Sequence, residues 1–136
     1  MPKIKARRNF IISATVVSTV GPPKVLPKFD SKINIPFIPD EMIVKSFSFI
    51  DHGSAMATPF VIINTNLIDT GNLMGFCVAT ADNNFNTNLV PLDLHFDIKK
   101  AVNGTYTFNL LSSNGDYIPD VINGSLIIHL EFISYQ

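Results

Sequence analysis

The chain has 136 residues, of which 46% are hydrophobic and 15% are charged. This length suits one ordinary domain and makes a second domain improbable. Because about 25% of residues are charged in an average soluble chain, the low charge content predicts that much of the surface is uncharged polar or covered by partners, and oligomerisation is the default expectation. A single cysteine, Cys77, excludes an intrachain disulfide framework and favours a reducing compartment.

The charges are divided unevenly along the chain. Seven of the ten bases but only one of the eleven acids lie in residues 1–32, and the most basic segment contains Lys3, Lys5, Arg7 and Arg8. Such a segment can contact nucleic acid, an anionic membrane or an acidic patch on a neighbouring subunit. Four bases without interleaved aromatic residues make a weak nucleic-acid footprint, so we favour docking against another subunit.

The first 35 residues are predicted to form a basic, proline-rich arm with one strand in it. Apolar residues at every second position from Phe10 to Val16 indicate that strand. The start also imitates a secretory signal, but serines and threonines dilute its apolar part and a clean cleavage site is missing, so we expect no signal peptide. Prolines at 22, 23, 27 and 36 favour extended backbone lying on a surface.

Residues 36–136 are predicted to form a jelly-roll domain. Short apolar runs bounded by Gly, Pro, Asn or Asp recur there, and apolar and polar residues alternate from Leu92 to Ile98. In the last run, from Ser125 to Tyr135, both faces are apolar, so this strand should be covered on both sides. Roughly seven or eight short strands, with no convincing helix, predict a single antiparallel β-sandwich of jelly-roll type.

No constellation of titratable residues predicts catalysis, a metal site or a cofactor. His52, His95 and His129 are too far apart for a local zinc pattern. Asp93 and Asp97 share a strand face but would lie about 13 Å apart, too far for paired-carboxylate hydrolysis. We therefore expect a protein that is not an enzyme and takes no small-molecule substrate.

Three Asn-Gly pairs are candidates for tight turns: Asn103-Gly104, Asn114-Gly115 and Asn123-Gly124. The first and third also match the glycosylation acceptor pattern. We favour the turn interpretation, because glycosylation requires a secretory route for which the start of the chain is poor evidence.

The sequences of several predicted strands and turns within residues 36–135 resemble those of a known group of proteins. They include Pro39 to Phe49, Leu67-Ile68, Gly75-Phe76, Asn103 to Phe108 and Gly124 to Phe132. This pattern resembles jelly-roll capsid proteins of double-stranded DNA viruses, especially minor or penton-type components. The resemblance implies a virion protein that packs against copies of itself and other capsid proteins, with the terminal arm tying subunits together.

The hypothesis of a structural capsid protein predicts a homo-oligomer. Its interface is expected to contain residues on the second apolar face of the last strand together with two phenylalanines: Phe47, Phe49, Ile127, Ile133 and Tyr135. The alternative is an oligomeric β-sandwich that binds a ligand, lectin-like or as a receptor-binding spike head. The polar tip at residues 82–88 is its candidate site.

Overall fold

The computed structural model describes residues 3–51, 60–68, 73–81, 84–86, 94–112, 114–119 and 121–136. These residues form nine β-strands and no helix. The strands are β1 (Ile4–Val17), β2 (Lys28–Asn34), β3 (Glu41–Asp51), β4 (Phe60–Thr65), β5 (Leu73–Ala81), β6 (Asn84–Asn86), β7 (Leu94–Asp97), β8 (Asn103–Leu111) and β9 (Asn123–Tyr135). Within these ranges there is accordingly no helix of the length and apolarity needed to cross a membrane.

The strands pair in a nested order. Apart from the short β6, the first strand pairs with the last, β2 with β8, β3 with β7, and β4 with β5, always antiparallel. This order is that of a long hairpin rolled up on itself, which is the jelly roll. In addition, β9 pairs with β3, and β4 pairs with β8. The strands therefore form two layers, β1-β9-β3-β7 and β2-β8-β4-β5. The predicted fold class is therefore confirmed.

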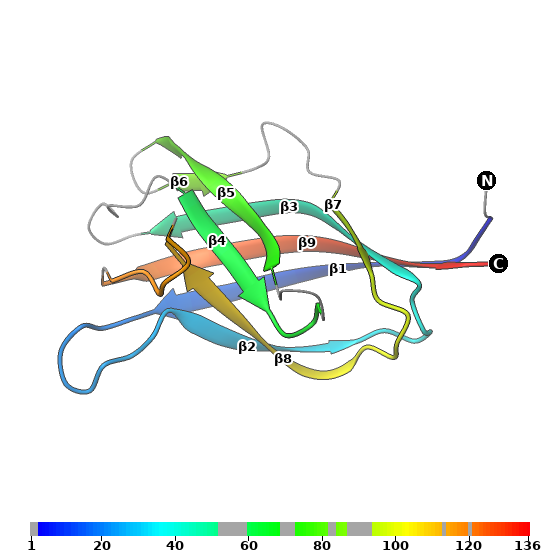
Figure 1. Cartoon of the computed structure of the whole chain (residues 1–136), viewed down its shortest axis with the longest axis horizontal. Helices are drawn as coiled ribbons and strands as arrows, with labels where there is room; N and C mark the ends of the chain where they lie inside the picture. Colours follow the sequence, from blue (N-terminus) through cyan, green and yellow to red (C-terminus); the bar gives the residue numbers. More distant parts are fainter. Residues whose placement is uncertain are drawn as a thin grey trace.

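The two layers face each other as a sandwich. In Figure 1, β4 and β5 cross over the layer formed by β3, β9 and β1. The short β6 pairs with both β3 and β5, so it joins the layers into one hydrogen-bonded path. Strands of opposite layers cross because each sheet is twisted, and the side chains between them form the core.

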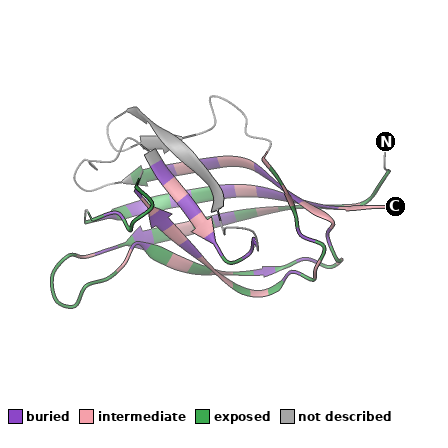
Figure 2. Ribbon diagram, in the orientation of Figure 1, coloured by how far each residue is buried: buried purple, intermediate pink, exposed green. Residues whose placement is uncertain are grey.

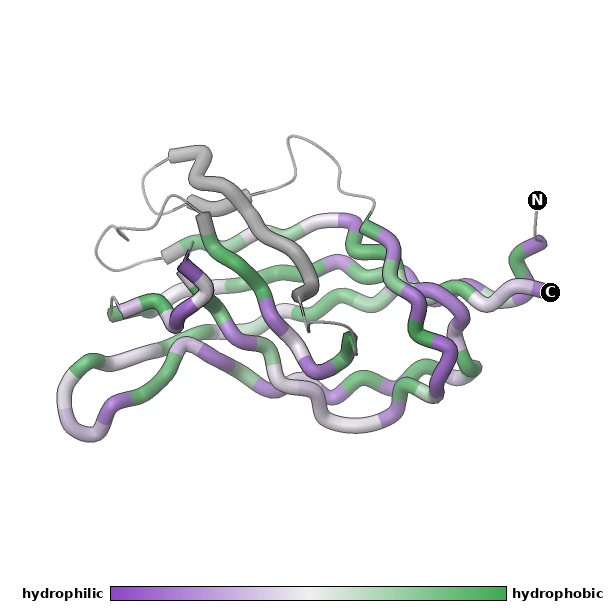
Figure 3. The backbone as a smooth tube through the Cα atoms, in the orientation of Figure 1, coloured by the Kyte–Doolittle hydropathy of each residue, from purple (hydrophilic) through white to green (hydrophobic). Residues whose placement is uncertain are grey.

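Alternate side chains of both layers form the core. In β9 the buried set is Leu126, Ile128, Leu130 and Phe132, and β8 contributes Phe108 and Leu110. The alternation of buried and exposed residues can be followed along the later part of β1 and the first part of β9 in Figure 2. The hydropathy in Figure 3 alternates less regularly, because both faces of β1 and β9 carry apolar residues. The period of two nevertheless relates the inward-facing residues of each strand to one another.

The predicted division into an arm, residues 1–35, and a domain, residues 36–136, is wrong. β1 pairs with β9 from Ile4 to Val17, and β2 pairs with β8 over its whole length. Ile12, Val16, Ile33 and Ile35 belong to the core. The prolines bound these strands instead of extending an arm: the strands of the sandwich end before Pro22 and Pro36 and begin after Pro27.

Two of the three expected Asn-Gly turns are also wrong. Gly115 has a φ of 86° and donates to Ser112 O at 2.9 Å, so Asn114-Gly115 is in a turn as predicted. The other two pairs are the first residues of β8 and β9 and lie opposite partner strands. Gly124 is glycine for a different reason: a Cβ there would lie 2.5 Å from the Ile50 carbonyl oxygen.

Candidate interaction surface on the outer sheet face

The outward-facing residues of β1, β9 and β3 form rows across the first layer. One row contains Ile11, His129 and Ser46; the next contains Ser13, Ile127 and Ser48; and the next contains Thr15, Ser125 and Ile50. In the opposite direction, the rows are Asn9, Glu131 and Ile43, then Arg7, Ile133 and Glu41. The two ends of this outer face differ in chemistry.

The uncharged end is defined by the rows of Ile127, Ser125 and Asn123, together with Ile11. None of the outward-facing residues in these rows is ionisable. Four aliphatic side chains are nonetheless exposed: Ile11 is 62% exposed, Val17 49%, Ile50 42% and Ile127 47%. Ile127 is the diagonal neighbour of both Ile11 and Ile50, and such neighbours lie about 7–8 Å apart. A line of isoleucines therefore crosses three strands.

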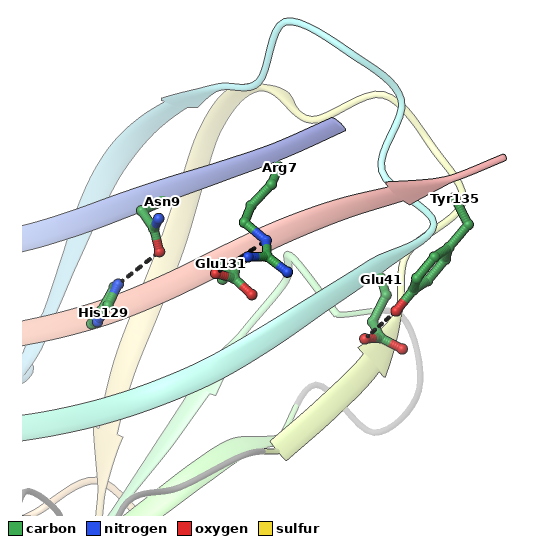
Figure 4. A network of polar contacts seen from close by, with 6 residues as sticks. All are labelled: Arg7, Asn9, Glu41, His129, Glu131 and Tyr135. Atoms are coloured by element: carbon green, nitrogen blue, oxygen red, sulfur yellow. Dashed lines mark hydrogen bonds and ion pairs between the residues drawn. The ribbon is translucent and has the colours of Figure 1, made fainter. Parts of the chain in front are cut away.

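The charged end carries polar side chains that contact one another, as Figure 4 shows. Nε of Arg7 lies 3.7 Å from a carboxylate oxygen of Glu131, and His129 Nε2 lies 3.0 Å from Asn9 Oδ1. Glu41 Oε1 accepts from the Tyr135 hydroxyl at 3.1 Å and lies 2.8 Å from His95 Nδ1. These ionisable side chains serve contacts within the layer.

Tyr135 is fixed at this end by two interactions. Its backbone N–H donates to Asp40 Oδ2 at 2.7 Å, in addition to the hydroxyl contact with Glu41. Desolvation and the acceptor carboxylate of Glu41 raise the pKa of the Tyr135 phenol above its ordinary value, because both disfavour the phenolate. An open depression of about 380 Å³ lies beside it, lined by Asp40, Glu41, Asp97, Lys99, Tyr135 and Gln136.

The five residues predicted to form an interface differ in their burial. Phe47 and Phe49 are fully buried between the layers, so their assignment to an interface is wrong. The bulge in β3 between Val44 and Ser46 shifts the alternation, and both rings point into the core. Ile133 faces outward but is only 3% exposed within the single chain, and Tyr135 is half-buried. Ile127 alone is an exposed apolar member of the set.

The predicted basic arm is the beginning of β1. Lys3 precedes the strand, while Lys5, Arg7 and Arg8 lie within it and are exposed. Arg7 belongs to the charged end through its ion pair with Glu131. β1 and β9 pair residue by residue from Ala6 to Val17. No local sequence pattern indicates this pairing, because it joins the two ends of the chain.

The remaining candidate residues are placed as far as the described part of the chain allows. No three His, Cys, Asp or Glu side chains gather there as metal ligands. His95 and His129 are strand residues with the partners given above, and Asp97 is exposed. His52 and Asp93 lie outside the described residues, as does most of the polar tip at 82–88, of which only the backbone of β6 is described.

Comparisons with known proteins give only distant structural similarity. No protein-family model and no curated protein matches this chain. A particle derived from infectious bursal virus aligns with 97% of this chain and 32% of its own, with 15% identity and a TM-score of 0.48. The Drosophila NLP core, described in terms of pentamer formation and histone binding, aligns over 89% and 96%, with 10% identity and a TM-score of 0.40.

A capsid structure of Helicobacter pylori bacteriophage KHP30 aligns with 96% of this chain and 97% of its own, with 10% identity and a TM-score of 0.35. The chain spans about a third of the infectious bursal virus protein that it matches. At these identities the likeness concerns the fold alone, and the chain is distantly similar in structure to viral capsid proteins and to the NLP core.

Proposed function

We propose that this protein is a structural, non-enzymatic subunit of a viral capsid, in a minor, vertex or cement-type position, and that it resides in the virion. It acts by packing against copies of itself. The observation that carries the proposal is the uncharged end of the outer face, where Ile11, Ile50, Ile127 and Val17 are exposed on one layer.

This surface has the composition of an interface. The cores of protein interfaces are depleted in charge and enriched in apolar area, whereas an isolated monomer rarely exposes a large contiguous apolar patch. Serine and threonine between the isoleucines supply hydroxyl groups but no charge. Two copies of this face can therefore meet about a two-fold axis without like-charge contact in these rows.

The overall composition supports the same role. With 15% charged residues, the chain has little charge to keep a monomer dispersed. At the charged end, Arg7, Glu131, Glu41 and His95 form contacts with neighbours in the layer. These contacts link β1 with β9 and β3 with β7 and β9, as interactions that hold a sheet together do.

A charge placed in the middle of the uncharged end tests the proposal. We expect the wild-type protein to be an oligomer by light scattering, and Ile127→Lys to reduce its mass toward that of the 15.0 kDa chain, because the lysine would have to be desolvated at the contact. Ile38→Lys is the matched control: Ile38 is 63% exposed but lies in the connection from β2 to β3.

Circular dichroism should give the same strand spectrum for all three proteins. An oligomer mass unchanged by Ile127→Lys, or lowered equally by Ile38→Lys, would contradict assembly through this face. Electron microscopy of the wild-type assemblies addresses the capsid role. Regular rings or shells are expected, and irregular aggregates would count against it.

A further inference from the structure

The edges of the sandwich are protected unequally. An edge strand presents unpaired backbone N–H and C=O groups that can pair with another chain, and proteins block such edges with short strands, charges or prolines. Among the described strands, β1, β2 and β7 each have a partner on one side only. β7 is four residues long. β2 follows Pro27 and alternates the exposed, charged Lys28, Asp30 and Lys32.

β1 lacks these protections over most of its length. It is 14 residues long, and its segment from Asn9 to Val17 contains no charged residue and no proline. Its bases, at positions 5, 7 and 8, are confined to the beginning of the strand. The segment Asn9 to Val17 is therefore a long, unblocked edge beside the uncharged end of the outer face.

We propose that this edge of β1 pairs antiparallel with β1 of a second copy, about a two-fold axis at Ile11. The proposal rests on the self-association proposed above and specifies one of its contacts. The charge distribution makes β1 compatible with its own copy in one orientation: parallel pairing would place Arg7 and Arg8 beside their own copies, whereas antiparallel pairing places them opposite the uncharged Thr15 and Ala14.

The register of the proposed pairing follows from the exposure of Ile11 and from the position of the loop that follows β1. Pairing about Ile11 sets this 62% exposed side chain against its own copy and sets Asn9 opposite Ser13. Beyond Val17 the chain turns back toward β2, with Thr19 N donating to Val25 O at 3.0 Å, so an axis farther along β1 would bring this loop into the contact. The layers β1-β9-β3-β7 of two copies would then form one continuous sheet.

This contact and the face contact have different consequences. A two-fold edge contact alone closes as a dimer. With the Ile127 face as a second, separate contact, each dimer can join others, which is what an extended assembly requires.

A cysteine at position 11 distinguishes pairing edge to edge from packing face to face. Directly opposed residues of antiparallel strands have Cα atoms about 4.5–5.5 Å apart, which suits a disulfide. Stacked sheets lie about 10 Å apart, beyond the roughly 7 Å limit for a disulfide. We therefore expect mild oxidation to convert Ile11→Cys protein into a disulfide-linked dimer.

Ser13→Cys is the matched control, because Ser13 is also exposed and faces outward. In this register Ser13 opposes Asn9 of the second copy, so the two introduced thiols of this variant would be separated by about 13 Å of strand and should not link. Both variants and the wild type contain Cys77, so any link through that residue appears in all three.

A dimer formed by Ile11→Cys and not by Ser13→Cys, on non-reducing electrophoresis, supports the edge contact. Equal yields from the two variants, or no dimer from Ile11→Cys, overturns it. The results also distinguish a failure of the edge contact from a failure of the face contact. An Ile11→Cys link that persists with Ile127→Lys shows the edge contact without the face. Large assemblies without the link overturn the edge alone, and a monomer without the link overturns both.

Discussion

Gly124 lies where β9 passes close to Phe49 and Ile50 of β3. A Cβ at this position would lie 2.5 Å from Ile50 O and 2.9 Å from the Phe49 ring, whereas a Cβ at Gly104 meets nothing within 4 Å. Overpacking of this kind costs about 1–3 kcal/mol. We expect Gly124→Ala to lower the free energy of unfolding by this amount in denaturant titrations. Gly104→Ala, in the matching Asn-Gly pair of β8, should change it little; equal effects would contradict the close approach.

Tyr135 makes the end of β9 sensitive to alkaline pH. Its pKa is raised by desolvation and by the Glu41 carboxylate. The Tyr135 phenol of the folded protein therefore keeps its proton at pH values where that of the unfolded chain has lost it. The contribution of this raised pKa to the stability of the folded protein is present below about pH 10 and is lost as the pH rises through the pKa of the folded protein. The stability advantage of wild type over Tyr135→Phe should shrink above this pH. In ultraviolet titration, the tyrosinate signal missing from the variant should be centred above the ordinary pKa; a signal at or below it would contradict this assignment.

At the scale of elements, β1 is a strand of the sandwich that supplies Ile12 and Val16 to the core. Deletion of residues 1–17 should therefore abolish the cooperative unfolding transition, because β9 loses its partner and the core is opened. Deletion of residues 1–3, which precede β1, should leave the transition in place. A shortened chain 18–136 that unfolds like the wild type would restore the arm interpretation.

At the scale of the whole molecule, the distribution of charge separates folding from assembly. The arginine, glutamates and histidines of the outer face gather at the end where the termini meet, with Gln136 N donating to Lys3 O at 2.8 Å (Figure 1). The isoleucines gather toward the other end of the same layer. Ile127→Lys therefore tests the face contact and Ile11→Cys tests the edge contact, at adjoining positions of the same layer, while the core beneath them is left intact.

The sequence by itself determined the fold class and much of the core. Period-two alternation in β8 and β9 places Phe108, Leu110, Leu126, Ile128 and Leu130 inward, because successive side chains of a strand point to opposite faces. Alternation reports which residues share a face. It carries no information on which strands are neighbours, since strand pairing joins segments far apart in the chain.

The tertiary structure decided the rest. Only the pairing of β1 with β9 shows that the basic segment belongs to the sandwich, and only the bulge in β3 turns Phe47 and Phe49 into the core. The candidate surface was found in part, through Ile127, because an apolar second face on a strand can be read locally. Its other members, Ile11 and Ile50, join it through register, and register is a property of the assembled sheet, set by the burial of one face against a second layer.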